Sequence, residues 1–144
     1  MTINFKKLNP DAKAPLRATQ SSAGADFYAF LREDVVVNAG QRLLIPTGIA
    51  VEIPVGYGGF VFPRSSLSSK HGITLANCVG VIDADYRGEV KVSLVNHGTE
   101  PYIIRNGDRI AQLVIMPVVT ADFTEKAVLS DTKRGSGGFG STGI

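Results

Sequence analysis

The chain has 144 residues, a mass of 15.3 kDa, a formal net charge of +2 and 44% hydrophobic residues, which is typical of one soluble globular domain. Lys and Arg are dispersed and no apolar run approaches the roughly 20 residues of a membrane span, so we expect neither a nucleic-acid nor a membrane partner. One cysteine and two histidines exclude an intrachain disulfide and a zinc site of the Cys/His type, so any metal would be a hard ion held by oxygen.

The N-terminal residues contain no long apolar stretch followed by a small-residue cleavage site, and we therefore expect a cytoplasmic protein. Short β-rich runs between glycine, proline and polar clusters predict an all-β fold. A short turn or helix is predicted for Ser65–Lys70 after Pro63. The predicted strands are Asp34–Val37, Arg42–Ile45, Ile49–Ile53, Gly59–Phe62, Glu89–Leu94 and Ala111–Met116.

Two of these strands carry opposite patterns. Val90, Val92 and Leu94 alternate with polar residues, which is typical of a strand with one buried face. The run from Leu113 to Val119 is apolar on both faces and indicates a strand covered on both sides. The second covering could be another subunit.

Several segments carry groups that could bind a ligand. Asp26 follows Ala23-Gly24-Ala25, where small residues permit close approach of another chain or a ligand, although the acid could simply belong to a turn. Pro63-Arg64-Ser65-Ser66-Leu67 offers a guanidinium group, hydroxyls and backbone amides, which bind anions, or else forms a capped turn with a solvated arginine.

The segment from Gly80 to Glu89 reads as a hairpin with an acid directly after an apolar run. On an extended chain Asp83 and Asp85 would share one face, with Ile82 and Tyr86 on the other. An acid at a strand end can face a pocket and act as a general base, whereas the alternative is a polar turn. Just upstream, Cys78 is predicted to be a small core residue.

From Asp131 onward the chain is mostly Gly, Ser, Thr and charged residues and cannot fold alone. It could be a disordered terminus. Phe139, the only aromatic residue there, could instead stack on a planar ligand while the glycines let the backbone wrap around phosphate, so that the tail acts as a lid.

Five segments, taken in order, resemble those of the trimeric dUTPases. The resemblance covers nearly the whole chain and implies a distorted jelly-roll-like antiparallel β-barrel at residues 1–130, followed by a flexible glycine-rich C-terminal arm at 131–144 that closes over the active site. It also implies a homotrimer with shared active sites. The segments are Ala23–Asp26, Pro63–Leu67, Asn77–Glu89, Asp108–Leu113 and Arg134–Gly143.

The reaction implied by the resemblance is hydrolysis of dUTP to dUMP and pyrophosphate, which keeps uracil out of DNA and supplies dUMP for thymidylate synthesis. Asp83 would be the general base that activates a water for attack on the α-phosphate. Mg²⁺ would be held by the phosphates and, through water, by Asp26.

The resemblance also assigns substrate contacts. Arg64, Ser65 and Gln112 would bind the phosphates, and Ser66, where many members have glycine, would contribute only its backbone amide. Arg109 is interpreted as a structural ion-pair partner. Asn77, Gly80 and Lys91 would recognise uracil, Tyr86 would exclude a 2′-hydroxyl, and the arm would contribute Arg134, Gly138, Phe139, Ser141 and Thr142.

Two other functions remain open at this point. A dCTP deaminase relative would share the fold and release ammonia from dCTP. A non-enzymatic nucleotide-binding trimer would bind a nucleotide or a partner protein without turnover.

Overall fold

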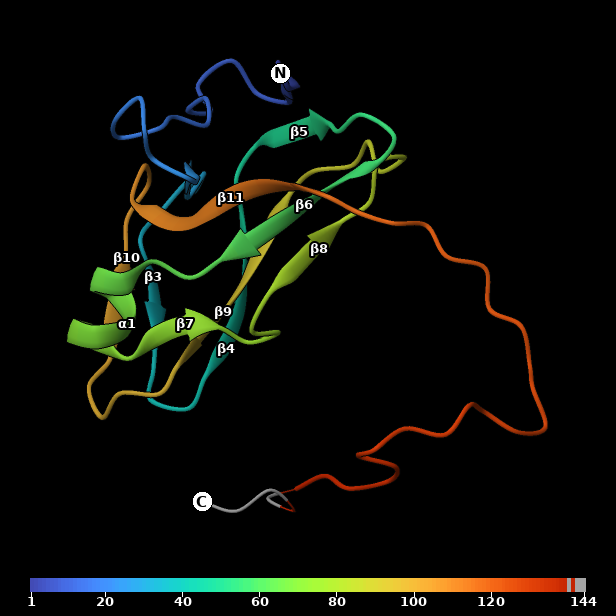
Figure 1. The fold of residues 1–144 in the computed structure, drawn as a ribbon. Coiled ribbons are helices and arrows are strands. Elements are labelled where there is room, and N and C mark those ends of the chain that lie inside the picture. Colours follow the sequence, from blue (N-terminus) through green and yellow to red (C-terminus); the bar gives the residue numbers. More distant parts are fainter. Residues whose placement is uncertain (140, 142–144) are drawn as a thin grey trace.

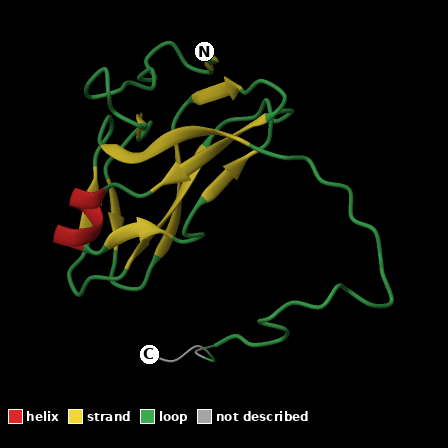
Figure 2. Ribbon diagram, in the orientation of Figure 1, coloured by secondary structure: helices red, strands yellow, loops and turns green. Residues whose placement is uncertain are grey.

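The computed structural model describes residues 1–139 and 141. Within these residues the chain forms eleven strands and one short helix, arranged around a single core (Figures 1 and 2). The elements are β1 (Asn4–Lys7), β2 (Ala25–Tyr28), β3 (Val35–Val37), β4 (Arg42–Pro46), β5 (Ile49–Glu52), β6 (Tyr57–Phe62), α1 (Ser65–His71), β7 (Ile73–Leu75), β8 (Gly80–Ile82), β9 (Lys91–Asn96), β10 (Tyr102–Ile104) and β11 (Arg109–Pro117).

The strands form one sheet of order β2–β11–β6–β8, one of order β4–β9–β7, and two ribbons, β1–β5 and β10–β3. All pairs are antiparallel. The predicted all-β, jelly-roll-like fold is confirmed. The described sheets pack as a sandwich, however, and do not join into one closed barrel.

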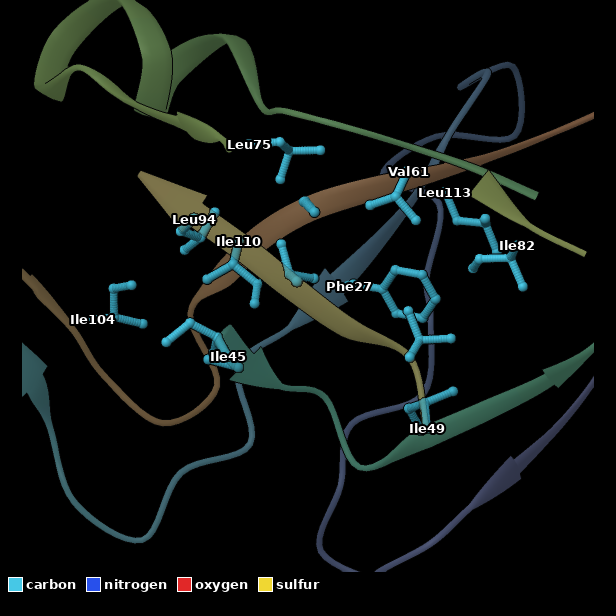
Figure 3. Packing of buried hydrophobic residues seen from close by; sticks show 14 of the residues in the cluster. Phe27, Ile45, Ile49, Val61, Leu75, Ile82, Leu94, Ile104, Ile110 and Leu113 are labelled. Atoms are coloured by element: carbon cyan, nitrogen blue, oxygen red, sulfur yellow. The ribbon is translucent and has the colours of Figure 1, made fainter. Parts of the chain in front are cut away.

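The core lies between the two larger sheets (Figure 3). Alternation in β9 turns Val92 and Leu94 inward, where both are buried, while Lys91 before them is exposed and Ser93 between them is half-buried. Side chains from the facing sheet, including Val61 and Leu113, complete the packing. Burial of such side chains contributes about 1.5–3 kcal/mol each, so this alternation positions β9 firmly.

The hairpin predicted for the segment from Gly80 to Glu89 is wrong. β8 pairs with β6, whereas β9 pairs with β4 and β7, so the two arms of the supposed hairpin belong to different sheets. Residues 83–90 cross from one sheet to the other. Because β8 and β9 diverge, a cleft opens between them.

The predicted helical turn is confirmed as α1, which ends at His71 and is followed by Gly72 in the left-handed region at φ 69°. Gly72 donates its N–H to the carbonyl of Ser68, and a Cβ there would collide with the backbone nitrogen of Gly98. Glycine is therefore required at this helix end. None of the described helices is long and apolar enough to cross a membrane.

The C-terminal segment leaves the sheets where β11 ends, at Pro117 (Figure 1). Val118 donates its N–H to the carbonyl of Gly56, and beyond it Val119 and Phe123 are almost fully exposed. In β11 itself, Val114 to Met116 are only half-buried. The expected second covering of this strand is therefore incomplete in one chain.

Candidate active site

The first cleft lies between β8, β9 and the crossing segment, and we call it the β8–β9 cleft. Its cavity volume is about 450 Å³. Apolar side chains such as Val61 and Leu75 form its floor. Five of the predicted residues line it: Asn77, Gly80, Asp83, Tyr86 and Lys91.

Asp83 directly follows β8 and begins a turn, in which the N–H of Tyr86 donates to the carbonyl of Asp83 at 3.2 Å. The expected placement of Tyr86 on the face opposite Asp83 is wrong, because the chain turns here and is not extended. Asp83 and Tyr86 line the same cleft, and Asp83 together with Asp85 also lines a neighbouring groove beside Val118. The turn thus brings the acid and the aromatic ring together.

Tyr86 is fixed by the residues that follow it. Its hydroxyl donates to the carbonyl of Glu89 at 2.9 Å, and a Cβ at Gly88 would collide with the Tyr86 ring. Glu89 is itself anchored, since its Oε1 accepts from the N–H of Gly48 at 2.8 Å. Nothing in the sequence patterns had indicated this role of Glu89.

Backbone groups face the β8–β9 cleft from both strands. β8 uses one edge to pair with β6, and Lys91 pairs with Pro46 of β4. On the other side of β9, pairing with β7 begins only at Leu94, and within the described residues no strand covers the edge at Lys91. Free strand edges of this kind can form hydrogen bonds with a planar ligand.

The second cleft has a cavity volume of about 300 Å³ and we call it the arginine cleft. Asp26 is nearly buried there between two guanidinium groups. Its Oδ1 lies 3.0 Å from Nε of Arg64, and its Oδ2 lies 3.2 Å from Nη1 of Arg109. The interpretation of Arg109 as an ion-pair partner is confirmed.

Gln112 and Ser65 complete the arginine cleft. The side-chain amide of Gln112 donates to the carbonyl of Pro63 at 3.0 Å. A Cβ at Gly24 would lie 2.8 Å from Oε1 of Gln112, so the small residues before Asp26 accommodate this side chain. Ser66 is exposed and does not line this cleft.

The remaining predicted residues belong to the arm, whose described part runs away from the sheets (Figure 1). None of the described arm residues lines either cleft. Phe139 is fully exposed. Nε of Arg134 donates to the carbonyl of Gly137, and the N–H of Ser141 donates to the carbonyl of Gly138. Thr142 lies outside the described residues.

Three further observations correct or limit the predictions. Cys78 is exposed, at φ 61°, and is not a core residue. The β8–β9 cleft and the arginine cleft share no lining residue, so one chain keeps the predicted base site and phosphate site apart. The described residues contain no cluster of three or more His, Cys, Asp or Glu side chains that could hold a metal by themselves.

The fold and clefts define a jelly-roll-like β protein with one site suited to a planar ring and one suited to anions. The sequence model of the dUTPase family matches residues 10–143. The chain belongs to the dUTPase family. It is 52% identical over 143 residues to a deoxyuridine 5′-triphosphate nucleotidohydrolase of Nautilia profundicola, with 99% of each chain covered. It is 51% identical to the enzyme of that name in Desulfitobacterium hafniense, covering 99% of this chain and 95% of the relative.

Solved structures of phage dUTPases share the fold. The dUTPase of Staphylococcus bacteriophage 80alpha with dUpNHpp superposes with a TM-score of 0.86 at 30% identity, covering 99% of both chains. A mutant dUTPase from phage phi11 of S. aureus, which shows the coordination of a structural Mg(II) ion, superposes with a TM-score of 0.81 at 27% identity. It covers 91% of this chain and 100% of its own.

Proposed function

We propose that this protein hydrolyses dUTP to dUMP and pyrophosphate, with Mg²⁺ as cofactor. The observation that carries the proposal is the β8–β9 cleft, in which Asp83 and Tyr86 line one cavity together with open backbone edges. Family membership and relatives at about half identity over nearly the full length support the same activity.

Uracil is recognised in the β8–β9 cleft by backbone groups near Gly80 and Lys91 and by the side-chain amide of Asn77. Uracil and cytosine present hydrogen-bonding groups of opposite polarity, and a buried mismatch can reject a wrong substrate by roughly 10⁴-fold or more. Tyr86 packs against the sugar and occupies the volume that a 2′-hydroxyl would need. This explains selection for a deoxyuridine nucleotide.

Asp83 acts as the general base. Its carboxylate accepts a proton from a water molecule, whose oxygen forms a new bond to the α-phosphorus. The bond between the α-phosphorus and the bridging oxygen breaks, and pyrophosphate leaves with its electron pair. The products are dUMP and pyrophosphate, without a covalent intermediate.

Arg64, Ser65 and Gln112 bind and orient the phosphates, with the backbone amide of Ser66 at the start of α1 as a further donor. Asp26 holds the Arg64 guanidinium through its Nε, and Nη1 donates to the carbonyl of Arg109 at 3.4 Å, which leaves Nη2 available to a phosphate. Fixing the triphosphate in line with the attacking water lowers the entropic part of the barrier.

The residues around Asp26 fit an outer-sphere magnesium site. Each of its carboxylate oxygens already accepts from one arginine and has a further lone pair for a metal-bound water. Mg²⁺ keeps several of its waters, so contact through water suits this ion. When bound, the ion neutralises charge on the phosphates and the leaving pyrophosphate.

The arm, residues 131–144, closes over the body formed by residues 1–130. Phe139 stacks on the base, and Gly138 lets the backbone approach the ligand. Arg134, Ser141 and Thr142 bind the phosphates. Because ordering the arm costs conformational entropy, closure depends on the number of phosphates present.

The active protein is a homotrimer that shares its sites between subunits, in the cytoplasm. One nucleotide must contact a base site and a phosphate site that have no lining residue in common in one chain. The half-buried end of β11 also leaves apolar surface for another subunit to cover.

The test is pyrophosphate release from dUTP with Mg²⁺, beside dCTP, dTTP and UTP at equal concentration. We expect rapid release from dUTP alone. Ammonia release from dCTP would indicate a deaminase, and nucleotide binding without turnover by the folded protein would indicate a binding module. Activity that falls on dilution below a threshold concentration, together with a trimer mass in solution, would support shared sites.

A further inference from the structure

We propose that Arg87 is a positioning residue that holds the turn carrying Asp83 and Tyr86 in its working geometry. The inference rests on the proposed function and adds a residue that does not line the β8–β9 cleft. Arg87 acts on the reaction only through the backbone of this turn.

One nitrogen of Arg87 donates two hydrogen bonds to backbone carbonyls of the turn. Nη1 of Arg87 donates to the carbonyl of Ala84 at 2.7 Å and to the carbonyl of Tyr86 at 3.0 Å. Both carbonyls belong to the turn between Asp83 and Tyr86. A planar guanidinium group with fixed donors is suited to tie such carbonyls together.

The Arg87 side chain also contacts a residue outside the turn. Nη2 of Arg87 lies 3.6 Å from Oε1 of Glu52, at the end of β5, and Oε2 of Glu52 accepts from the side-chain amide of Asn4 at 2.9 Å. Arg87 therefore connects the turn to the β1–β5 ribbon. Both partners of this ion pair are about half exposed, so the pair contributes little to global stability.

The far end of the turn is held separately, by the bond from the Tyr86 hydroxyl to the Glu89 carbonyl. With Arg87 in place the turn is fixed at both ends. Without it, Asp83 and Tyr86 can shift together relative to β9. A shift of about 1 Å at a reacting group can cost up to roughly 10²-fold in rate, and a displaced Tyr86 ring no longer fills the 2′-hydroxyl volume.

The ratio of kcat/KM for dUTP to kcat/KM for UTP distinguishes a positioning role of Arg87 from a purely structural role. A stability defect lowers kcat/KM for dUTP and UTP by the same factor, because it removes active molecules. A displaced turn lowers kcat/KM for dUTP through Asp83 and relaxes the exclusion of UTP through Tyr86. The ratio of the two values therefore reports geometry.

The experiment compares Arg87→Ala, Arg87→Lys and Glu52→Gln with Arg32→Ala, an exposed arginine in the loop between β2 and β3. We expect Arg87→Ala to lower kcat/KM for dUTP roughly 10-fold and to lower the dUTP/UTP ratio clearly. Arg87→Lys should restore part of the ratio, Glu52→Gln should have a smaller effect, and Arg32→Ala should have none.

An unchanged ratio in Arg87→Ala, or an equal loss with both substrates, would overturn the proposal. Failure of the wild-type protein to release pyrophosphate from dUTP would instead refute the proposed function. In that case hydrogen exchange still decides whether Arg87 holds the turn. The amide of Tyr86, which donates to the Asp83 carbonyl, should exchange faster in Arg87→Ala than in Arg32→Ala. Equal exchange rates would show that Arg87 does not hold the turn.

Discussion

In the β8–β9 cleft, Asp83 and Tyr86 lie on a turn held by hydrogen bonds within residues 83–90, a segment that Glu89 ties to Gly48 of the folded body, whereas Phe139 in the arm is fully exposed. The cleft is formed by residues of the folded body. We propose that the arm gains contacts when it meets a ligand or another surface. Substitutions in the cleft should therefore affect chemistry and local geometry, while substitutions in the arm should affect binding and leave the body unchanged.

The largest effect is expected at Asp83. Asp83→Asn removes the base but keeps the size of the side chain, so kcat should fall by about 10²–10⁴-fold. Binding of a non-hydrolysable dUTP analogue should stay within about threefold of wild type, since the amide keeps the hydrogen-bonding capacity at this position. The measurements are steady-state kinetics and calorimetric titration.

Asp85→Asn is the matched control, because Asp85 lines the neighbouring groove and not the β8–β9 cleft. Its turnover should resemble that of wild type. A large loss in Asp85→Asn, together with retained turnover in Asp83→Asn, would show that Asp83 is not the base.

The arm side of the comparison is tested at Phe139. Phe139→Ala should weaken productive binding by about 1–3 kcal/mol, or roughly 5- to 150-fold, if the ring stacks on the base. The melting temperature should not change, because the ring contacts nothing in the described structure that would be lost.

Phe123→Ala provides the control for Phe139, since Phe123 is equally exposed but precedes the glycine-rich arm. Nucleotide binding should be unaffected by it. Equal effects of the two substitutions would indicate a general contribution of apolar residues rather than stacking by Phe139.

A smaller effect, on stability, is expected in the arginine cleft. Asp26→Ala leaves Arg64 and Arg109 without their shared carboxylate and should lower the free energy of unfolding by about 1–3 kcal/mol. Urea unfolding at one fixed protein concentration measures this change. The concentration of Mg²⁺ needed for half-maximal activity should rise in the same variant. Unchanged stability would contradict a prebuilt cleft.

The smallest effect concerns the Tyr86 hydroxyl. Tyr86→Phe keeps the ring but removes the bond to the Glu89 carbonyl, which should cost about 0.5–1.5 kcal/mol. The expected result is a modest loss of dUTP over UTP selectivity at nearly constant kcat for dUTP. A selectivity equal to that of wild type would mean that packing against Gly88 alone fixes the ring.

Much of the fold could be predicted from local patterns. Alternation of Val90, Val92 and Leu94 correctly predicted one buried face, and Pro63 followed by serines correctly predicted the short helix α1. The strands absent from the predicted set, β1, β2, β7, β8 and β10, are three or four residues long. Such short runs carry too little periodicity to be recognised, and their conformation depends on pairing with distant strands.

The candidate site, like the fold, could be predicted only in part. The ordered segments identified the family, and the resemblance assigned residues such as Asp83 and Arg64 to roles that stay predictions. The ion pair of Arg87 with Glu52 and the hydrogen bond from Gly48 to Glu89 were not predicted, because the partners lie far apart in sequence.

The sequence by itself determined the all-β class, the buried face of β9, the family and the identity of the chemical groups, because these depend on residue types and their local spacing. Only the tertiary structure decided that β8 and β9 belong to different sheets, that Asp83 lines the same cleft as Tyr86, and that Cys78 is exposed. Strand pairing and turn geometry are set by contacts between residues distant in sequence, so no local pattern contains them.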